Sequence, residues 1–303
     1  MIDLLRARRA RGSRAPHRDG ASIALAVEGG AMRGVISAGM VWALEDLGLV
    51  DAFDAVYGSS AGAINAAYFL GGRAGLGTTI YYEDINSAKF IDLARPLRGR
   101  PIVDLGFLLD DVAVRRKQLP LDKVLASASP LTIVVTDVEA GKACALRSFA
   151  STGDLVAALR ASATMPVVAG GPHSFGGRRY LDASISEPIP VPTAELDGHT
   201  HVLALLTRSG AMRPQPSALD RYYVAPRLRR ISPDLAHQYL TRAAPYDELI
   251  RHIDAGTGPL GRSHVLAVRA PDCHISRLER RRTVLENGAQ RGYAAVMALF
   301  GER

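Results

Sequence analysis

Short apolar runs alternate with helical segments in the first quarter of the chain. Ile23 to Val27 is an unbroken apolar run, which is typical of a strand buried on both faces. Ala55 to Tyr57 is a second, shorter run of the same kind. Each run leads into a glycine-containing loop and then into a helical segment, which ends near Gly48 in the first case and near Gly71 in the second. This repeated order of strand, loop and helix predicts a parallel sheet with right-handed crossovers.

The alternation continues to the end of the chain, with one irregular stretch. Strands are expected at Leu131–Val138, Ala143–Phe149, Tyr180–Asp182, Val202–Leu206 and Val265–Val268, the first two joined by a turn. Helices are expected at Leu155–Ala163, 217–254 and Leu278–Leu299. Residues 75–128 lack a clear period, and we interpret them as helices and loops that lie over the sheet. Together the elements predict a three-layer α/β/α fold with a mostly parallel central sheet.

A single domain is the simplest organisation for this chain. Its 303 residues are 48% hydrophobic, enough for a large core, and contain no internal repeat or low-complexity linker. We assign residues 21–303 to that domain, with a motif-bearing core at about 23–206 and a helical C-terminal part at about 217–303. Residues 1–20 carry six arginines where a secretory signal needs apolar residues, so they are predicted to form a disordered basic tail.

Charge and cysteine content narrow the partners and the compartment. The formal net charge of +7 comes almost entirely from arginine and favours anionic partners, either phospholipid headgroups or nucleic acid. Nucleic acid is not expected, because the chain has no zinc finger, RNA-recognition motif or basic helix followed by heptads. Only Cys144 and Cys273 occur, and no run approaches the roughly eighteen apolar residues of a membrane span. We therefore expect a cytoplasmic protein and leave peripheral contact with an anionic membrane open.

Gly58-Ser59-Ser60-Ala61-Gly62 fits the G-x-S-x-G pattern of a nucleophile elbow. In an elbow the serine occupies a tight turn between a strand and a helix, and the flanking glycines let neighbouring backbone approach closely. An apolar strand directly before this segment and a small-residue helix directly after it supply that context. Ser60 is therefore the candidate nucleophile, with a serine that only caps the helix as the alternative.

A second glycine-rich loop, Gly29-Gly30-Ala31-Met32-Arg33-Gly34, also lies between a predicted strand and a predicted helix. Its backbone N–H groups suit an anion, which is compatible either with a bound nucleotide or with the oxyanion of an acyl-transfer reaction. The dinucleotide pattern needs glycine where Ala31 stands and an acidic residue after the second strand, where the serine elbow follows instead. The elbow favours an oxyanion hole formed by Gly29, Gly30, Ala31 and Arg33, and nucleotide binding stays an alternative.

Taken in order, these segments resemble the motifs of the patatin-like phospholipases. The glycine-rich loop ending in Arg33-Gly34, the Gly58-x-Ser60-x-Gly62 elbow and Asp182 after an apolar strand are similar to the family's three motifs. Ala161–Pro166 and Tyr180–Asp182 are similar to further family segments, as are Pro188 and Pro190. The resemblance extends from about Ile23 to Leu206 and is closest to bacterial members.

This resemblance implies a mechanism and a substrate class. Ser60 is implied to be the nucleophile and Asp182 the general base, with the loop as oxyanion hole and Gly34, Gly58 and Gly62 as supporting residues. The implied activity is that of a carboxylic ester hydrolase in lipid degradation, acting on fatty-acyl esters of phospholipids, lysophospholipids or neutral lipids through an acyl-enzyme. No cofactor is implied. Ser60 and Asp182 each follow an apolar strand, so we expect them to meet where parallel strands end at one edge of the sheet.

A Ser-His-Asp esterase of the α/β-hydrolase type is one alternative. It needs a histidine after Asp182, which His264 or His274 would supply, but such enzymes place several strands before the elbow and here the elbow follows the second. A metal site is not expected, because no His-Glu-x-x-His segment or paired cysteine spacing occurs.

A catalytically weak protein that binds lipid or a protein partner is another alternative. Ala31 replaces a family glycine, and we expect its N–H to serve the oxyanion only if φ there is negative. Ala183-Ser184 replaces the small residues that follow the family aspartate, which bears on how Asp182 is presented.

The irregular stretch at 75–128 is predicted to cover the site and to contact lipid aggregates. It combines apolar Phe107, Leu108 and Leu109 with a basic group at 115–117. Activity on anionic vesicles should then fall as salt rises, since exposed charges are screened within roughly 8 Å at physiological ionic strength.

Overall fold

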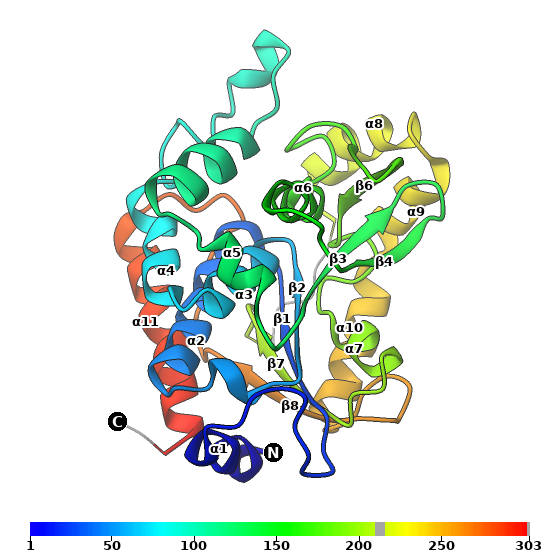
Figure 1. The fold of residues 1–303 in the computed structure, drawn as a ribbon. Helices are drawn as coiled ribbons and strands as arrows, with labels where there is room; N and C mark the ends of the chain where they lie inside the picture. Colours follow the sequence, from blue (N-terminus) through cyan, green and yellow to red (C-terminus); the bar gives the residue numbers. More distant parts are fainter. Residues whose placement is uncertain (210–215, 302–303) are drawn as a thin grey trace.

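A central sheet organises the computed structural model, which describes residues 1–209 and 216–301 (Figure 1). The strands follow the order β5-β6-β3-β2-β1-β7-β8, and β4 also pairs with β3. Their bounds are β1 Ile23–Val27, β2 Ala55–Ser59, β3 Leu131–Asp137, β4 Lys142–Leu146, β5 His173–Phe175, β6 Arg178–Asp182, β7 His201–Leu206 and β8 His264–Arg269. The neighbours from β3 through β2, β1 and β7 to β8 are parallel, whereas β4 and β6 run antiparallel to β3. The mostly parallel sheet expected from the sequence is confirmed.

Helices cover both faces of this sheet and complete the three layers (Figure 1). One face carries α2 Gly34–Asp46, α3 Ala61–Leu70, α4 Ala74–Glu83 and α11 Arg282–Leu299, which contact one another. The other carries α7 Val191–Leu196 and α10 Ala243–Asp254, whose apolar residues share a core cluster with the strands. Helices α6 Thr152–Ala163, α8 Ala225–Arg229 and α9 Pro233–Thr241 lie near β6 (Figure 1).

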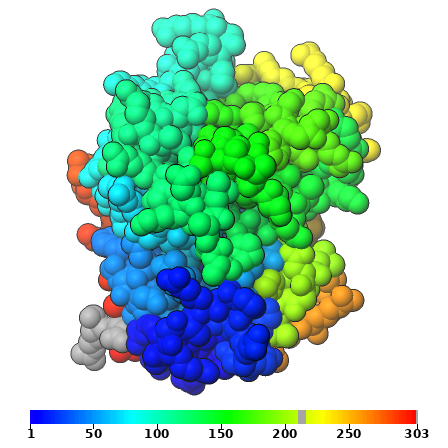
Figure 2. Space-filling model, viewed as in Figure 1, coloured from blue at the N-terminus to red at the C-terminus, as the bar shows by residue number. Residues whose placement is uncertain are grey.

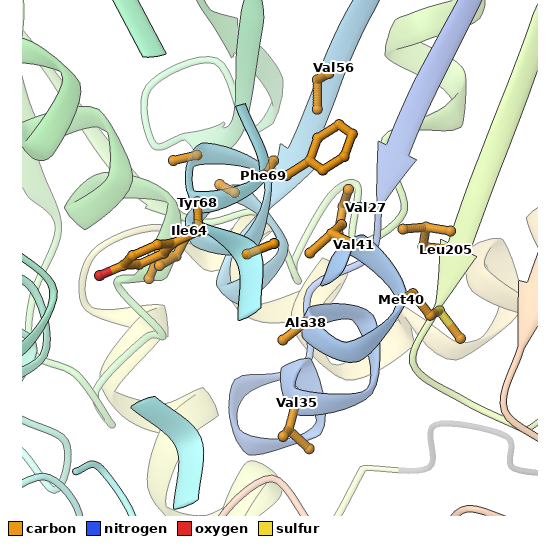
Figure 3. Close-up of a cluster of buried hydrophobic side chains, with 14 of the residues drawn as sticks. Val27, Val35, Ala38, Met40, Val41, Val56, Ile64, Tyr68, Phe69 and Leu205 are labelled. Carbon is orange, nitrogen blue, oxygen red and sulfur yellow. The ribbon is translucent and has the colours of Figure 1, made fainter. Parts of the chain in front are cut away.

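Alternate residues of the central strands serve the two faces, as the period of a strand requires. Leu25 and Val27 of β1 belong to the larger core cluster, in which side chains of α2 and α3 meet the strands (Figure 3). Ala24 and Ala26 belong to the cluster with α7 and α10. Because both faces are covered, every residue of β1 and β2 is buried, which explains why these strands are unbroken apolar or small-residue runs.

Two strands that point toward each other bring the candidate catalytic residues together. The first half of β3 pairs in parallel with β2, with Ser59 opposite Val134. The second half pairs antiparallel with β6, with Asp182 opposite Val135. Since β4 pairs with both halves along its own side, β2 and β6 lie end to end on the other side of β3. The prediction that two parallel strands deliver Ser60 and Asp182 is therefore wrong in its geometry: β6 runs opposite to β2, and the two strands meet head to head.

The N-terminal segment differs from the predicted disordered tail. Residues Ile2–Arg11 form helix α1, in which Leu5 is fully buried and Arg8 is only 1% exposed. The Arg8 guanidinium lies 2.8 Å from carboxylate oxygens of both Asp19 and Asp54. These two carboxylates neutralise the buried charge, and their pairing with Arg8 is a long-range feature that a local charge pattern does not reveal.

Residues 74–125 form helices and loops above the site, as the sequence predicts. After α4 the segment contains η3 Arg95–Arg98, a π-helix labelled η4 at Phe107–Arg116, and α5 Leu121–Leu125. The part around η3 projects from the body at the top of Figures 1 and 2. Within the two described ranges, every helix is too short or too polar to pass through a lipid bilayer.

Candidate active site

Ser60 stands in a strained turn between β2 and α3. Its φ of 55° lies in the left-handed region, which costs a non-glycine residue about 1–3 kcal/mol and is found where the surroundings hold the strain. A Cβ at residue 62 would lie 2.3 Å from the carbonyl oxygen of Val27, so only glycine fits there. The Ser60 N–H donates to Ser162 Oγ at 2.7 Å, and Ser162 Oγ donates to the Val134 carbonyl oxygen at 2.6 Å. The elbow is therefore held from α6 and β3.

A short hydrogen bond joins the two predicted catalytic side chains. Ser60 Oγ donates to Asp182 Oδ2 at 2.6 Å, and Asp182 is fully buried. The other carboxylate oxygen, Oδ1, accepts the Ser184 N–H at 2.7 Å. Burial raises the pKa of Asp182, and the hydrogen bonds from Ser60 and Ser184 and the charge of Arg277 oppose that rise only in part. The site thus holds a desolvated carboxylate directly against a serine hydroxyl.

No histidine forms a hydrogen bond with Ser60 or Asp182 in the part of the chain that the structure describes. Of the two candidates from the esterase alternative, His264 stacks near His201 with ring centroids 5.4 Å apart, and His274 contacts Ser209. The geometry places the serine directly on the carboxylate.

The glycine-rich loop lies against the elbow. A Cβ at residue 29 would be 2.7 Å from Ser60 Cβ, so glycine is required for this approach. The four predicted oxyanion residues differ in whether their backbone N–H groups already have a hydrogen-bond partner. Gly29 donates its N–H to the Pro188 carbonyl oxygen at 3.2 Å, and Arg33 donates to the Gly30 carbonyl oxygen at 3.1 Å. The N–H groups of Gly30 and Ala31 make no hydrogen bond with any described residue and are available.

Ala31 has φ of 51°, so the expectation of a negative φ is wrong. Its neighbour Met32 fixes the turn, because the Met32 N–H donates to the Arg277 carbonyl oxygen at 3.3 Å. The N–H of Ala61, at the N-terminus of the ten-residue helix α3, likewise has no partner among the described residues. Three free backbone N–H groups therefore belong to residues beside Ser60, which suits a developing anion.

Residues that the sequence analysis did not single out brace this loop. Asn65 Nδ2 donates to the Gly34 carbonyl oxygen at 2.8 Å and to Ser37 Oγ at 3.1 Å. Tyr81 Oη donates to Asn65 Oδ1 at 3.0 Å. Ser162 lies in the segment that resembles the family, which was a usable signal, but nothing local marks Asn65 or Tyr81. Their roles depend on α3, α4 and the loop meeting in three dimensions.

An apolar cavity opens beside the Ser60 side chain. Its volume is about 40 Å³, and its lining includes Ser60 itself and Ala31 and Met32 of the glycine-rich loop. The rest of the lining is almost entirely apolar and comes mainly from α3 and from the covering segment, including Ile64, Ile80, Ile85, Leu105 and Leu108. Such a lining suits a hydrocarbon chain. Within residues 1–209 and 216–301, His, Cys, Asp and Glu side chains form no group of three or more suited to a metal ion.

The structure is an α/β fold in which Ser60, in a strained turn, meets the buried Asp182 beside an apolar cavity. The sequence model described as patatin-like phospholipase matches residues 25–195, more than half of the chain. The chain therefore belongs to the patatin-like phospholipase family.

Two individual proteins are also similar. The uncharacterized protein YjjU of Escherichia coli (strain K12) is 28% identical over 212 residues, which cover 66% of this chain and 56% of YjjU. This chain thus corresponds to little more than half of the length of that relative. The crystal structure of VipD from Legionella pneumophila aligns with a TM-score of 0.49 and 12% identity, covering 95% of this chain and 69% of VipD.

Proposed function

We propose that this protein is a serine acyl hydrolase that cleaves fatty-acyl esters of phospholipids, lysophospholipids or related lipids with Ser60 and Asp182 as its dyad. The observation that carries the proposal is the 2.6 Å hydrogen bond from Ser60 Oγ to the fully buried carboxylate of Asp182. The free N–H groups of the adjoining loop and the apolar cavity beside Ser60 support it, as does membership of the family.

The proposed reaction has two steps. Asp182 removes the Ser60 proton while Ser60 Oγ bonds to the ester carbonyl carbon, and the oxyanion accepts hydrogen bonds from Gly30, Ala31 and Ala61. The carbon–oxygen bond to the alcohol then breaks, and the alcohol leaves with the proton held by Asp182. Water repeats the sequence on the acyl-enzyme: Asp182 takes its proton, the hydroxide attacks the carbonyl carbon, and the fatty acid departs as Ser60 is reprotonated.

A lone aspartate is a weak base for this task, with an ordinary pKa of about 3.9. Burial raises the pKa of Asp182, which makes its ionised form a stronger base. The remaining stabilisation is assigned to the backbone donors, each of which contributes about 10²–10³ in rate in comparable oxyanion holes. The proposal therefore assigns proton transfer to the desolvated carboxylate and stabilisation of the oxyanion to the fixed N–H groups.

The substitutions that motivated a binding-only alternative do not disturb this geometry. Ala31 leaves its N–H free in spite of its positive φ. Ser184, which follows Ala183, donates its N–H to Asp182 and so keeps the carboxylate oriented. These two observations support an active enzyme over an inactive binding module.

The nucleophile can be tested with a matched pair of serine variants. Ser60→Ala should abolish hydrolysis of p-nitrophenyl butyrate with the thermal unfolding midpoint retained. Ser59→Ala is the control, because Ser59 Oγ donates to the Glu187 carbonyl oxygen at 2.9 Å and does not contact Asp182. Loss of all activity in Ser59→Ala, with Ser60→Ala still active, would refute the assignment.

We also propose that the projecting part of the covering segment contacts anionic lipid surfaces. Leu93 and Leu97 are 69% and 91% exposed there, and the neighbouring Arg98 and Arg100 are exposed. Of the residues first predicted for this contact, Leu108 and Leu109 are buried, whereas Arg115 and Arg116 are exposed. Exposed leucines insert into the apolar part of a membrane, and neighbouring arginines are attracted to its anionic headgroups.

Vesicle sedimentation tests this contact. Leu97→Asn should weaken binding to phosphatidylserine-containing vesicles several-fold, and binding of the unchanged protein should fall as salt rises. Leu196→Asn is the matched control, because Leu196 is 67% exposed on α7, outside the covering segment. Equal loss in both variants, or binding indifferent to salt, would remove the proposal.

A further inference from the structure

A second cavity lies beside the dyad and has no counterpart in the reaction described above. It measures about 360 Å³, within the range of about 300–1,000 Å³ usual for small-molecule sites. The loop after Asp182, residues 184–188, forms one wall, and Tyr246 and Leu249 of α10 form another. Arg208, Arg242 and Arg277 also line it. The wall at 184–188 lies within the matched residues 25–195, whereas these arginines and α10 lie outside them, so the family match does not account for the basic lining.

Arg33 of the glycine-rich loop is buried, and it lies close enough to Arg208 and Arg277 for their charges to act on it. The pKa of Arg33 is lowered to about 9 by burial and by the neighbouring charges of Arg208 and Arg277. Arg33 and Arg208 are largely shielded from water and Arg277 is half-buried. Like charges held together in such surroundings are unfavourable unless anions compensate them. The buried carboxylate of Glu28 offsets one of these three positive charges, and it also accepts hydrogen bonds from Thr207 and from Tyr246 Oη.

Several donors of these arginines have no acceptor. The side chain of Arg208 is 10% exposed, and its Nε and that of Arg33 are buried without a hydrogen-bond partner among the described residues. Arg208 Nε lies 3.7 Å from Glu28 Oε1, within ion-pair distance but beyond hydrogen-bond length, and its guanidinium covers the Tyr246 ring at 4.4 Å. Arg277 forms no hydrogen bond through its side chain with any described residue.

The fourth arginine and the carboxyl groups that line the cavity do not compensate the charges of Arg208 and Arg277. Arg242 is engaged by Asp220 and by the carbonyl oxygen and ring of Tyr239. Of the lining carboxyl groups, Glu187 is buried with its pKa raised to about 7, so near neutrality a large share of it is uncharged. Glu248 is exposed and therefore solvated. The unsatisfied groups are cationic donors, which suit a tetrahedral oxyanion with several acceptor oxygens.

The cavity is linked to the catalytic residues at two points. Ser184 lines it and donates its N–H to Asp182. Arg277 lines it, while its charge acts on the pKa of Asp182 and its carbonyl oxygen accepts the Met32 N–H. Met32 in turn lines the apolar cavity. An ester held at Ser60 with its acyl chain in the apolar cavity would therefore have its alcohol portion close to the arginines.

We propose that Arg208 and Arg277, together with Arg33, form a subsite for the phosphate group of the substrate's headgroup. This inference rests on the proposed function and specifies its substrate class: acyl esters whose alcohol portion carries a phosphate are preferred to neutral esters with the same acyl chain. The C-terminal part of the chain supplies this preference.

The test compares two soluble esters that differ only in the phosphate, butyryl glycerol phosphate and monobutyryl glycerol. The unchanged protein should favour the phosphate-bearing ester about tenfold or more in kcat/KM, the size expected from charge-assisted hydrogen bonds. In Arg208→Gln and in Arg277→Gln this ratio should fall about tenfold. Arg251→Gln, an exposed arginine of α10 that does not line the cavity, should keep the ratio of the unchanged protein. A ratio near one in the unchanged protein, or equal ratios in all variants, overturns the inference.

A binding measurement separates this inference from the proposed function. Calorimetric titration of the full-length Ser60→Ala protein with glycerol phosphate should show binding that Arg277→Gln weakens about tenfold. If glycerol phosphate binds in this way but the unchanged protein hydrolyses neither ester, the hydrolase is refuted and the anion subsite is kept. Hydrolysis of p-nitrophenyl butyrate without any such binding keeps the hydrolase and removes the subsite. If inorganic phosphate binds as tightly as glycerol phosphate and inhibits both esters alike, the site takes a free regulatory anion and the headgroup assignment is wrong.

Discussion

The two cavities beside the dyad differ in lining, size and origin. The apolar cavity is narrow, at about 40 Å³, and is lined at Ser60 by family-matched residues. The basic cavity is about 360 Å³ and takes its arginines from positions 208, 242 and 277, beyond the matched range. The matched part of the chain thus supplies Ser60, Asp182 and most of the cavity that we assign to the acyl chain. The part after residue 195 supplies the arginines of the cavity that we assign to the headgroup.

Asp182→Asn should reduce activity the most, because the proposed reaction uses Asp182 for every ester. We expect kcat to fall at least 10³-fold for phosphate-bearing and neutral esters alike. The unfolding midpoint near neutral pH should be kept or raised. The raised pKa of Asp182 means that its ionised form costs the folded state free energy above that pKa, and the amide removes this cost. Steady-state kinetics and calorimetry check both parts, and a loss confined to one ester would break the shared-dyad account.

The pH dependence of the unchanged protein follows from the same pKa. Since Asp182 must be ionised to act as base and its pKa is raised, kcat/KM should decline on the acidic side at a higher pH than an ordinary aspartate allows. A profile flat down to about pH 4, the ordinary range of an aspartate, would contradict a buried general base.

A smaller effect, restricted to the apolar cavity, is expected from Ile64→Phe. Ile64 is 5% exposed and lines this cavity, so a larger side chain should obstruct the acyl chain. The kcat/KM for p-nitrophenyl octanoate should fall about tenfold more than that for the acetate, with a stability cost of about 1–3 kcal/mol from overpacking. Ile250→Phe on α10, which lines neither cavity at the dyad, is the control. Equal loss on both esters would remove the acyl-chain assignment.

The smallest effect concerns the wall of the basic cavity. Glu187 has its pKa raised from 4.5 to about 7, mainly by burial, so it is protonated in the folded protein at pH values where the unfolded chain is ionised. The contribution of Glu187 to the free energy of unfolding is therefore fully present below about pH 4.5 and is lost as the pH rises to about 7. Glu187→Gln should remove part of that decline and raise the unfolding midpoint at pH 8 by about 2–4 °C, the size of about 1 kcal/mol in a domain this large. Exposed Glu248→Gln should not, and an equal gain in both variants would contradict the assignment.

The sequence predicts the matched part of the fold well because its signals are local. Residues Ile23–Val27 form β1 as expected, since a strand buried on both faces has to be an unbroken apolar run. The elbow at Ser60 and the glycine-rich loop are also local: each needs glycine where backbones approach. The 2.6 Å contact of Ser60 with Asp182 joins two such segments, but its head-to-head geometry depends on β6 running antiparallel, which the pattern at Tyr180–Asp182 does not contain.

The features that were missed depend on long-range partners. Helix α1 is ordered by a buried arginine, Arg8, that pairs with two distant aspartates, so a basic run that reads as a tail is fixed by tertiary contacts. The basic cavity is likewise assembled from the loop after β6, the segment after β7, α10 and the segment before α11, with no motif to mark it. In the sequence, Arg208 and Arg277 belong to a scattered positive charge, and only the fold brings them near Arg33.

The central claim is that Ser60 acts with Asp182 and without a histidine, and fluorophosphonate labelling tests it most directly. Peptide mapping of the unchanged protein should find the label on Ser60. The second-order rate of labelling should fall at least a hundredfold in Asp182→Asn and change less than threefold in His264→Ala and His274→Ala, whose side chains do not contact the dyad. A label on another residue, or a folded histidine variant as slow as Asp182→Asn, would contradict the account.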